Sequence, residues 1–324
     1  MDKCKCLFFS FIFLLAVCCY LVLTQEQLDK IKAAKFDTYH TAEEVDEFVV
    51  NSNDNPFYTH YVVGGEKMSV YGPVDDAHMF SVRILMVCGQ HGRELVPTEL
   101  CLKVIQALQM EDSIFWNATK YHGIGMWIVP LVNAWSRVQA FERGDECQRH
   151  NANGVDLNRN FPLEYSSLES KAPGDEEYAG SMPFSEWESR AIDECLKWIE
   201  PQVLFNVHSG SQDILLPFDY TEERRPDDYN VMVRLANLAR KGTSCKVGQG
   251  SLLLYPAYGT LGDHAVLHRH VQLAYTLEIY GRQVESCFAA FNPSPGIQLQ
   301  LVLEEWVKFL ANFIDILPSQ LIKN

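Results

Sequence analysis

The sequence predicts an α/β fold with a largely parallel or mixed central sheet. Four short apolar runs have the character of buried strands, and segments with helical periodicity lie between them. Strands that alternate with helices along a chain are typical of this fold class. The 324 residues are 47% hydrophobic and 21% charged, which fits a globular protein. No repeat or long linker divides residues 25–324, so we interpret them as a single domain.

The elements follow from capping and periodicity. Residues 41–44 (Thr-Ala-Glu-Glu) and 185–188 (Ser-Glu-Trp-Glu) have the pattern of capping boxes, each ahead of a helix. After the second box, apolar residues such as Ala191 and Cys195 recur at helical spacing. The predicted strands lie within 80–88, 125–129, 203–207 and 273–277, and a last amphipathic helix covers about 298–316.

The first 24 residues have the pattern of a secretory signal peptide. Lys3 and Lys5 precede an apolar run that gives way to a polar segment at Gln25. The run is shorter than the roughly 20 residues of a membrane-spanning helix, so a retained N-terminal anchor is the less favoured alternative. We therefore expect a secreted protein, or one in the lumen of a secretory or vacuolar compartment.

The cysteines are compatible with an oxidising compartment, and the charge bears on the partners. Six cysteines beyond the leader could form up to three disulfides, whose pairing the sequence leaves open. They are Cys88, Cys101, Cys147, Cys195, Cys245 and Cys287. Asn117 is a candidate glycosylation site, because Thr119 follows it. The formal charge of −15 argues against nucleic acid as a partner and favours cationic substrates.

Three candidate site residues lie at the ends of predicted strands. His91 follows the first strand, His208 ends the third and Glu278 follows the fourth. Ligands of open α/β sheets bind beyond the carboxyl ends of the strands. We therefore expect these three side chains at one edge of the sheet.

His91 and Glu94 are candidate metal ligands, with His208 as the third. Catalytic zinc takes three protein ligands, typically imidazoles and a carboxylate, and leaves a position for water. The i, i+3 spacing lets His91 and Glu94 converge on one ion, but such a pair is a weak signal alone. Alternatively, His91 is a polar loop residue, Glu94 interacts with a helix dipole and His208 is a hydrogen-bonded strand-end residue.

A second histidine group is a weaker metal candidate. His268 and His270 flank Arg269 and would share one face of a strand, with His264 nearby. Asp263 is the one carboxylate close to them in the sequence, and Arg269 adds positive charge. We expect no metal there.

Glu278 is the candidate general base. Hydrolysis at zinc needs a carboxylate that takes the proton of the attacking water and passes it to the leaving amine. Glu278 comes after a strongly apolar strand with no lysine or arginine beside it, and burial of such a group is costly without a partner or a function. The alternative is a strand-end carboxylate in solvent.

The segment 148–162 carries polar groups that suit an anionic ligand. Arg149, Asn158 and Arg159 lie around a turn at Gly154, where guanidinium groups could bind a carboxylate or stabilise an oxyanion. A solvated basic loop is the alternative, which is unattractive in so acidic a protein.

Five segments together resemble the zinc metallocarboxypeptidases of the carboxypeptidase A/B and N/E kind, in the same order. The segments are 91–94 (His-Gly-Arg-Glu), 154–161 (Gly-Val-Asp-Leu-Asn-Arg-Asn-Phe), 206–212 (Asn-Val-His-Ser-Gly-Ser-Gln), 255–260 (Tyr-Pro-Ala-Tyr-Gly-Thr) and 277–281 (Leu-Glu-Ile-Tyr-Gly). The resemblance runs from about Tyr39 to the C-terminal helix. It implies a mixed, mostly parallel eight-stranded sheet flanked by helices, and one Zn²⁺ per chain.

The resemblance also implies roles for individual residues. His91, Glu94 and His208 would bind the zinc, and Glu278 would be the general base. Arg149 would polarise the scissile carbonyl and stabilise the oxyanion.

Other matched residues would bind the substrate, which is the C-terminus of a peptide or protein. Asn158 and Arg159 would hold its terminal carboxylate. Tyr255 would close over it, and Arg93 would line the outer subsites. We expect a monomer with these properties.

The chain departs from the family pattern in three respects. There is no room between the leader and Tyr39 for the long pro-domain of the digestive members, and no extra C-terminal β-domain follows. The loop 140–153 differs in length, so Arg143 is a fallback for Arg149. Gly262 occupies the position that often sets specificity and carries no side chain.

Specificity is therefore predicted at Asp219, which corresponds to the aspartate that pairs with a C-terminal Lys or Arg in N/E-type enzymes. The alternative is a solvated turn residue beside Tyr220 and Glu222. Two other functions stay open: a zinc deacylase or amidohydrolase that acts on small N-acyl amino acids, and a non-catalytic peptide-binding homologue. No ligand or base is lost here, which argues against the latter.

Overall fold

The computed structural model describes residues 38–65, 68–162 and 171–317. The predicted signal peptide, residues 1–24, lies outside them. In the described part, eight strands form one sheet in the order β1-β2-β4-β3-β5-β8-β6-β7. The strands are β1 (Tyr58–Val63), β2 (Met68–Pro73), β3 (Val82–Val87), β4 (Ile124–Val129), β5 (Val203–His208), β6 (Gln212–Leu216), β7 (Lys246–Gln249) and β8 (Leu273–Ile279).

The four predicted strands are the four central ones, and they are neighbours. β4, β3, β5 and β8 pair in parallel. Each is almost wholly buried, because helices cover both faces of the sheet, and a strand buried on both faces reads as a continuous apolar run. β1, β2 and β6 add antiparallel pairings, and β7 is parallel to β6, so the sheet is mixed as expected.

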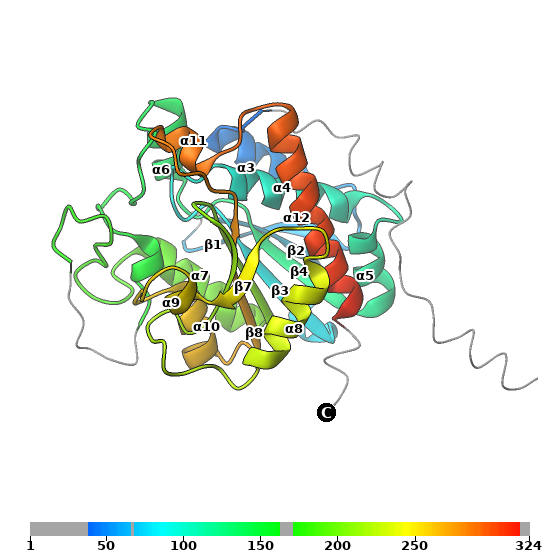
Figure 1. The fold of residues 1–324 in the computed structure, drawn as a ribbon. Coiled ribbons are helices and arrows are strands. Elements are labelled where there is room, and N and C mark those ends of the chain that lie inside the picture. The colour runs from blue at the N-terminus through cyan, green and yellow to red at the C-terminus, as the bar shows by residue number, and fades with distance from the viewer. Residues whose placement is uncertain (1–37, 66–67, 163–170, 318–324) are drawn as a thin grey trace, which may run out of the picture.

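Helices flank the sheet on both sides (Figure 1). In chain order they are α3 (Ala42–Val50), α4 (Val96–Gln109), α5 (Ile114–His122), α6 (Ala134–Arg137), α7 (Trp187–Ile199), α8 (Tyr229–Ala239), α9 (Gly250–Leu253), α10 (Leu261–Arg269), α11 (Cys287–Phe291) and α12 (Ile297–Ile316). Short 3-10 or π turns lie at Ala77–Met79, Val138–Glu142 and Leu157–Arg159. The predicted α/β architecture and the last helix are confirmed.

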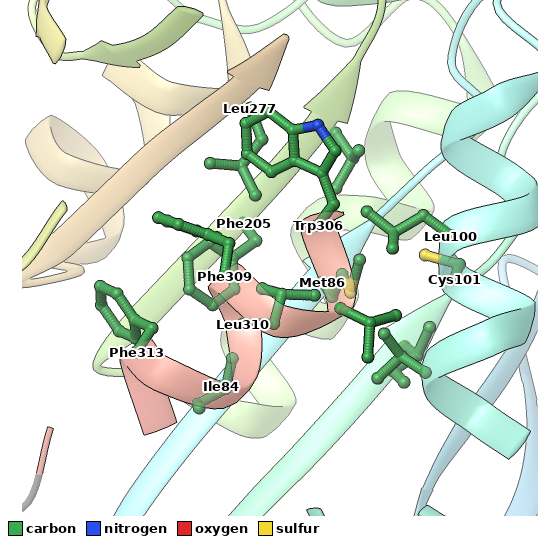
Figure 2. Close-up of a cluster of buried hydrophobic side chains, with 14 of the residues drawn as sticks. Ile84, Met86, Leu100, Cys101, Phe205, Leu277, Trp306, Phe309, Leu310 and Phe313 are labelled. Atoms are coloured by element: carbon green, nitrogen blue, oxygen red, sulfur yellow. The ribbon is translucent and has the colours of Figure 1, made fainter. Parts of the chain in front are cut away.

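Two apolar cores fix the sheet between the helices. One contains buried residues of α4, α5, α8 and α12 together with Ile84 and Met86 of β3. Figure 2 shows Trp306, Phe309 and Phe313 of α12 in this core. The other core contains α7 and α10 with the alternate residues of β3. The strands are therefore held rigidly, and their carboxyl ends are fixed relative to one another.

One predicted capping box forms and the other does not. The Thr41 hydroxyl accepts from the backbone of Glu44, and the Glu44 carboxylate accepts from the backbone of Thr41, at 3.2 and 2.8 Å. The box at Ser185 was wrong: α7 begins at Trp187 with no side-chain cap. The Ser185 hydroxyl instead donates to the Glu186 carboxylate at 2.7 Å and accepts from the Asn160 amide at 2.9 Å, so it does not cap the helix.

The second histidine group also differs from expectation. Its residues belong to the helix α10, not to a strand, and His270 ends that helix in a left-handed conformation. His264 pairs with Asp193 of α7, with 2.8 Å between Nε2 and Oδ1, and Arg269 binds the same carboxylate. The group is a structural contact between α7 and α10.

Two disulfides fasten the segments that carry site residues. Cys88–Cys101 joins the end of β3 to α4, and Cys147–Cys287 joins the loop before Arg149 to α11. Cys195 and Cys245 are buried thiols, so two of the three possible bridges form. Among the described residues, no helix combines the length and the apolar character that crossing a bilayer requires.

Candidate metal centre and substrate cavity

His91, Glu94 and His208 converge at the carboxyl ends of the adjacent parallel strands β3 and β5. The Glu94 carboxylate lies between the two imidazoles, 2.7 Å from His91 Nδ1 and 2.9 Å from His208 Nδ1. All three side chains are buried, and their ligand atoms lie within 4.8 Å of one another. Within the described ranges no other group of this kind exists. Two imidazole nitrogens and a carboxylate oxygen are the donor set of catalytic zinc, and the residues fit the ion.

The surroundings prepare these groups for a cation. Burial alone would raise the pKa of Glu94, but His91 and His208 beside it hold that pKa well below its ordinary value. Nε2 of His208 is buried without a hydrogen-bond partner in the described structure. The site therefore concentrates an ionised carboxylate and two imidazoles in buried surroundings at the cavity.

Asp156 supports the site from behind and was missed from the sequence. Its Oδ1 lies 2.9 Å from His91 Nε2, and its Oδ2 accepts from Nε and Nη2 of Arg149 at 2.9 and 2.7 Å. Burial would raise the pKa of Asp156, but Arg149, Arg159 and His91 hold it well below its ordinary value. A proton on His91 Nε2 would face this carboxylate, which leaves Nδ1 for a metal. The signal available in the sequence was a lone aspartate between two apolar residues, Val155 and Leu157.

The structure distinguishes Arg149 from its fallback. Nη1 of Arg149 lies 3.5 Å from the Glu94 carboxylate, in the wall of the cavity. Arg143 is exposed and donates to Gln139 at 3.4 Å. The ion pair with Asp156 holds the Arg149 guanidinium in this place, and the disulfide at Cys147 fastens the loop that carries it.

All ten predicted site residues line one cavity. They are His91, Arg93, Glu94, Arg149, Asn158, Arg159, His208, Asp219, Tyr255 and Glu278. Since these residues come from strand ends, a 3-10 turn and loops far apart in the chain, the fold brings together what the sequence separates.

Glu278 lies opposite His208 in the pairing of β5 with β8. Burial, and next the charge of Glu94, raise its pKa to about 7. Its Oε2 atom is buried without a hydrogen-bond partner in the described part of the chain. The alternative of a solvated strand-end carboxylate is therefore wrong, and a carboxylate in this condition can accept and return a proton near neutral pH.

Arg159 is the buried guanidinium on the other side of the cavity. Its Nη1 donates to the Asn158 carbonyl at 3.0 Å, and its Nη2 donates to Glu177 at 2.6 Å and to the Tyr255 hydroxyl at 3.2 Å. The Asn158 side chain accepts from the backbone of Leu261, at the start of α10. The 3-10 turn that carries both residues is thereby tied to α10.

Asp219 lies in the cavity wall, close to Gly250 and Gly262. It is 9% exposed, and its Oδ2 accepts from the Thr260 hydroxyl at 2.9 Å, so the solvated alternative is wrong. Burial raises its pKa to about 6, although Thr260 and Arg159 oppose the rise. Gly250 leaves the space that the carboxylate fills.

Arg93 lies at the outer part of the cavity. Its guanidinium stacks 4.3 Å from the centre of the Phe291 ring and pairs with Glu176. Asn292, next to Phe291, accepts from the backbone of Leu95 and Val96 at 2.7 and 3.1 Å. This contact fixes the start of α4, directly after Glu94.

Comparison with known families gives one match over most of the chain. Residues 40–304 match the family described as zinc carboxypeptidase. Carboxypeptidase B of Rattus norvegicus is 25% identical over 256 residues, which are 71% of this chain and 59% of that protein. Carboxypeptidase B2 of Homo sapiens is 27% identical over 215 residues, which are 59% of this chain and 49% of that protein. The chain thus spans about half to three-fifths of these relatives.

Solved structures have the same fold. Bovine thrombin-activatable fibrinolysis inhibitor, in complex with tick carboxypeptidase inhibitor, superposes with a TM-score of 0.74 at 20% identity, over 89% of this chain and 100% of that one. Carboxypeptidase A of Helicoverpa armigera gives 0.73 at 20% identity, over 90% and 76%. At this identity the likeness concerns the fold, which agrees with the eight-stranded mixed sheet.

Proposed function

The chain belongs to the zinc carboxypeptidase family, and from this premise we propose that it is a zinc-dependent metallocarboxypeptidase that hydrolyses the C-terminal peptide bond of peptides or proteins. One observation carries the proposal: the candidate zinc ligands and the Arg159 guanidinium line the same cavity. A metal site alone would serve any hydrolase. A buried cation at a fixed place beside it selects substrates that end in a carboxylate.

The chemical step follows from the residues around the metal. When bound to His91, Glu94 and His208, zinc supplies a Lewis acid that polarises a carbonyl and lowers the pKa of water. Glu278 takes the proton from the attacking water and delivers it to the leaving amine, a role that suits a carboxyl whose pKa is raised to about 7. Arg149 donates to the oxygen on which negative charge develops.

Binding of the terminal residue makes the reaction exopeptidic. Arg159 and Asn158 hold the terminal carboxylate, so that only the last peptide bond reaches the metal. Tyr255 is half exposed at the cavity and accepts a hydrogen bond from Arg159. It closes over the bound C-terminal residue of the substrate. Arg93 contacts the residues upstream.

Asp219 gives the cavity a preference for C-terminal Lys or Arg. Its buried carboxylate accepts from the Thr260 hydroxyl and forms no ion pair among the described residues, although three arginines line the same cavity. A cationic substrate side chain would form an ion pair with this carboxylate and so compensate the cost of its burial. The acidic net charge of −15 acts in the same direction at long range.

The cellular setting is part of the proposal. Residues 1–24 are a signal peptide, residues 25–324 form a single catalytic domain, and the protein is secreted as a monomer. Two disulfides support an oxidising compartment. Asn117 lies on α5, and its side-chain amide donates to the Asp112 carbonyl at 3.3 Å. Glycosylation of Asn117 stays a prediction.

A peptide panel tests this function. Purified protein is incubated with peptides that differ only in the C-terminal residue, with their C-terminal amides and with small N-acyl amino acids, each with and without a zinc chelator. We expect chelator-sensitive release of the last residue from the acids and none from the amides. Cleavage of N-acyl amino acids alone would support the deacylase instead, and binding without release would support a peptide-binding homologue.

A further inference from the structure

A short loop directs two consecutive glutamates at two arginines of the cavity. Glu176 pairs with Arg93, and Glu177 Oε1 lies 2.6 Å from Arg159 Nη2. The loop is fastened close by: the backbone of Asp156 donates to the carbonyl of the residue after Glu177 at 2.8 Å, and His150 contacts the carbonyl of Glu176 at 3.0 Å. The contact of Glu177 with Arg159 therefore belongs to an anchored loop.

Glu177 takes a donor that a bound carboxylate needs. The two N–H groups of Arg159 Nη2 are directed to Glu177 and Tyr255, and Nη1 already donates to the Asn158 carbonyl. A carboxylate that binds a guanidinium in the bidentate manner uses two N–H groups. An incoming carboxylate that binds through Nη2 must therefore take an N–H group from Glu177 or Tyr255, and of these two only Glu177 competes with it by charge.

The competition concerns charge and one N–H group, not space. Glu177 does not line the cavity, whereas Arg159 and Tyr255 do. The Glu177 side chain is 33% exposed, so water can solvate it when the contact breaks. Arg159 is 8% exposed and keeps its contact with Asn158, so its position does not depend on Glu177 alone.

We propose that Glu177 competes with the terminal carboxylate of substrates and products for Arg159, and thereby sets the affinity of the cavity for free C-termini. The inference rests on the proposed role of Arg159. This competition lowers the affinity of the cavity for the freed amino acid and thereby speeds its release. Glu176, its neighbour, contacts Arg93 instead and provides a matched control.

Ligand binding to the zinc-loaded protein tests the inference without turnover. Calorimetry measures the Kd of Nα-acetyl-lysine or Nα-acetyl-phenylalanine, whichever binds the wild type more tightly, and of its C-terminal amide. Glu177→Gln and Glu177→Ala are expected to bind the acid about tenfold more tightly. Both variants lack the charge-assisted hydrogen bond between Glu177 and Arg159, which is partly exposed and therefore of moderate strength. The amide should bind as before, and Glu176→Gln should resemble the wild type.

Three results would overturn the inference. The Glu177 variants would bind the acid as the wild type does, or they would bind acid and amide equally more tightly. In the third case they would bind the acid more weakly, which would make Glu177 a residue that positions Arg159. Arg159→Gln is measured in parallel. If it leaves acid binding unchanged, the proposed carboxylate role of Arg159 fails, which is a different result from a Glu177→Gln protein that behaves like the wild type.

Discussion

Oδ1 of Asp219 fills the space beside Gly250 that a β-carbon would need. A β-carbon at Gly262 would lie 3.8 Å from Oδ2, an ordinary contact distance. The position of the carboxylate therefore depends on the absent side chain at Gly250. A methyl group at Gly262 would touch the carboxylate without displacing it.

Gly250→Ala should move Asp219 and weaken any preference for basic C-termini. Because the added methyl group overlaps the carboxylate, kcat/KM for a C-terminal Lys should fall roughly 10- to 100-fold relative to Phe, the penalty of a displacement of about 1 Å. Gly262→Ala is the matched control, with a smaller change. An unaltered Lys-to-Phe ratio in Gly250→Ala would contradict this role of the glycine.

Asp219→Ala removes the acidic group itself. We expect kcat/KM for peptides ending in Lys or Arg to fall about 100-fold, as loss of one partner of a buried charge pair does. Peptides that end in Phe should be affected much less, since they do not use the carboxylate. Competition assays between Lys- and Phe-terminated peptides measure the ratio directly, and a constant ratio would remove Asp219 from specificity.

The preference for basic residues should depend on pH. Burial raises the pKa of Asp219 from 3.8 to about 6, so the group is charged above pH 6 and becomes neutral as the pH falls through that value. The substrate lysine stays protonated, so the Lys-to-Phe ratio of kcat/KM should drop roughly tenfold between pH 7 and pH 5. The ratio cancels the titration of Glu278, which both substrates share. In Asp219→Asn it should be low and flat, and a fall of the same size there would assign the effect to another group.

The central strands were predictable because their environment is uniform. Residues such as Ile84 and Leu85 face opposite cores and are both apolar, which gives a run without alternation. β7 has only four residues, and β6 begins with the polar Gln212 and Asp213, so neither produces such a run. These two strands form because they pair with neighbouring strands of the sheet. A local sequence pattern does not contain that information.

The site shows the same division. Metal ligands and the base stand at strand ends in recognisable spacing, and the structure brings them to one cavity. Asp156, Glu177 and Gly250 act through partners that are distant in the sequence, for example His91, 65 residues before Asp156. Their residue types are common in loops, so their contacts become visible only in the folded chain.

Asp156→Asn should weaken the hold on zinc. Loss of the charge beside His91 and Arg149 leaves the imidazole less well oriented and less basic, and the expected reduction in zinc affinity is about 10- to 100-fold. Competition with a chromophoric chelator measures it. Asp193→Asn is the control, because Asp193 also joins a histidine and an arginine, outside the cavity. An equal loss in both variants would indicate a general effect of a buried charge.

Glu278→Gln should separate binding from chemistry. The amide nearly preserves the shape of the side chain but cannot take a proton from water, so kcat should fall about 10²- to 10⁴-fold. Zinc content and the Kd of a C-terminal ligand should stay close to those of the wild type, because Glu278 is neither a metal ligand nor part of the carboxylate site in this scheme. Glu188→Gln is a matched control: burial raises the pKa of Glu188 as well, but this residue lies on α7 outside the cavity. Rapid-mixing measurements of a single turnover, together with metal analysis, distinguish the outcomes. Full activity in Glu278→Gln would refute the assignment of the base, and loss of zinc from that variant would make Glu278 part of the metal site.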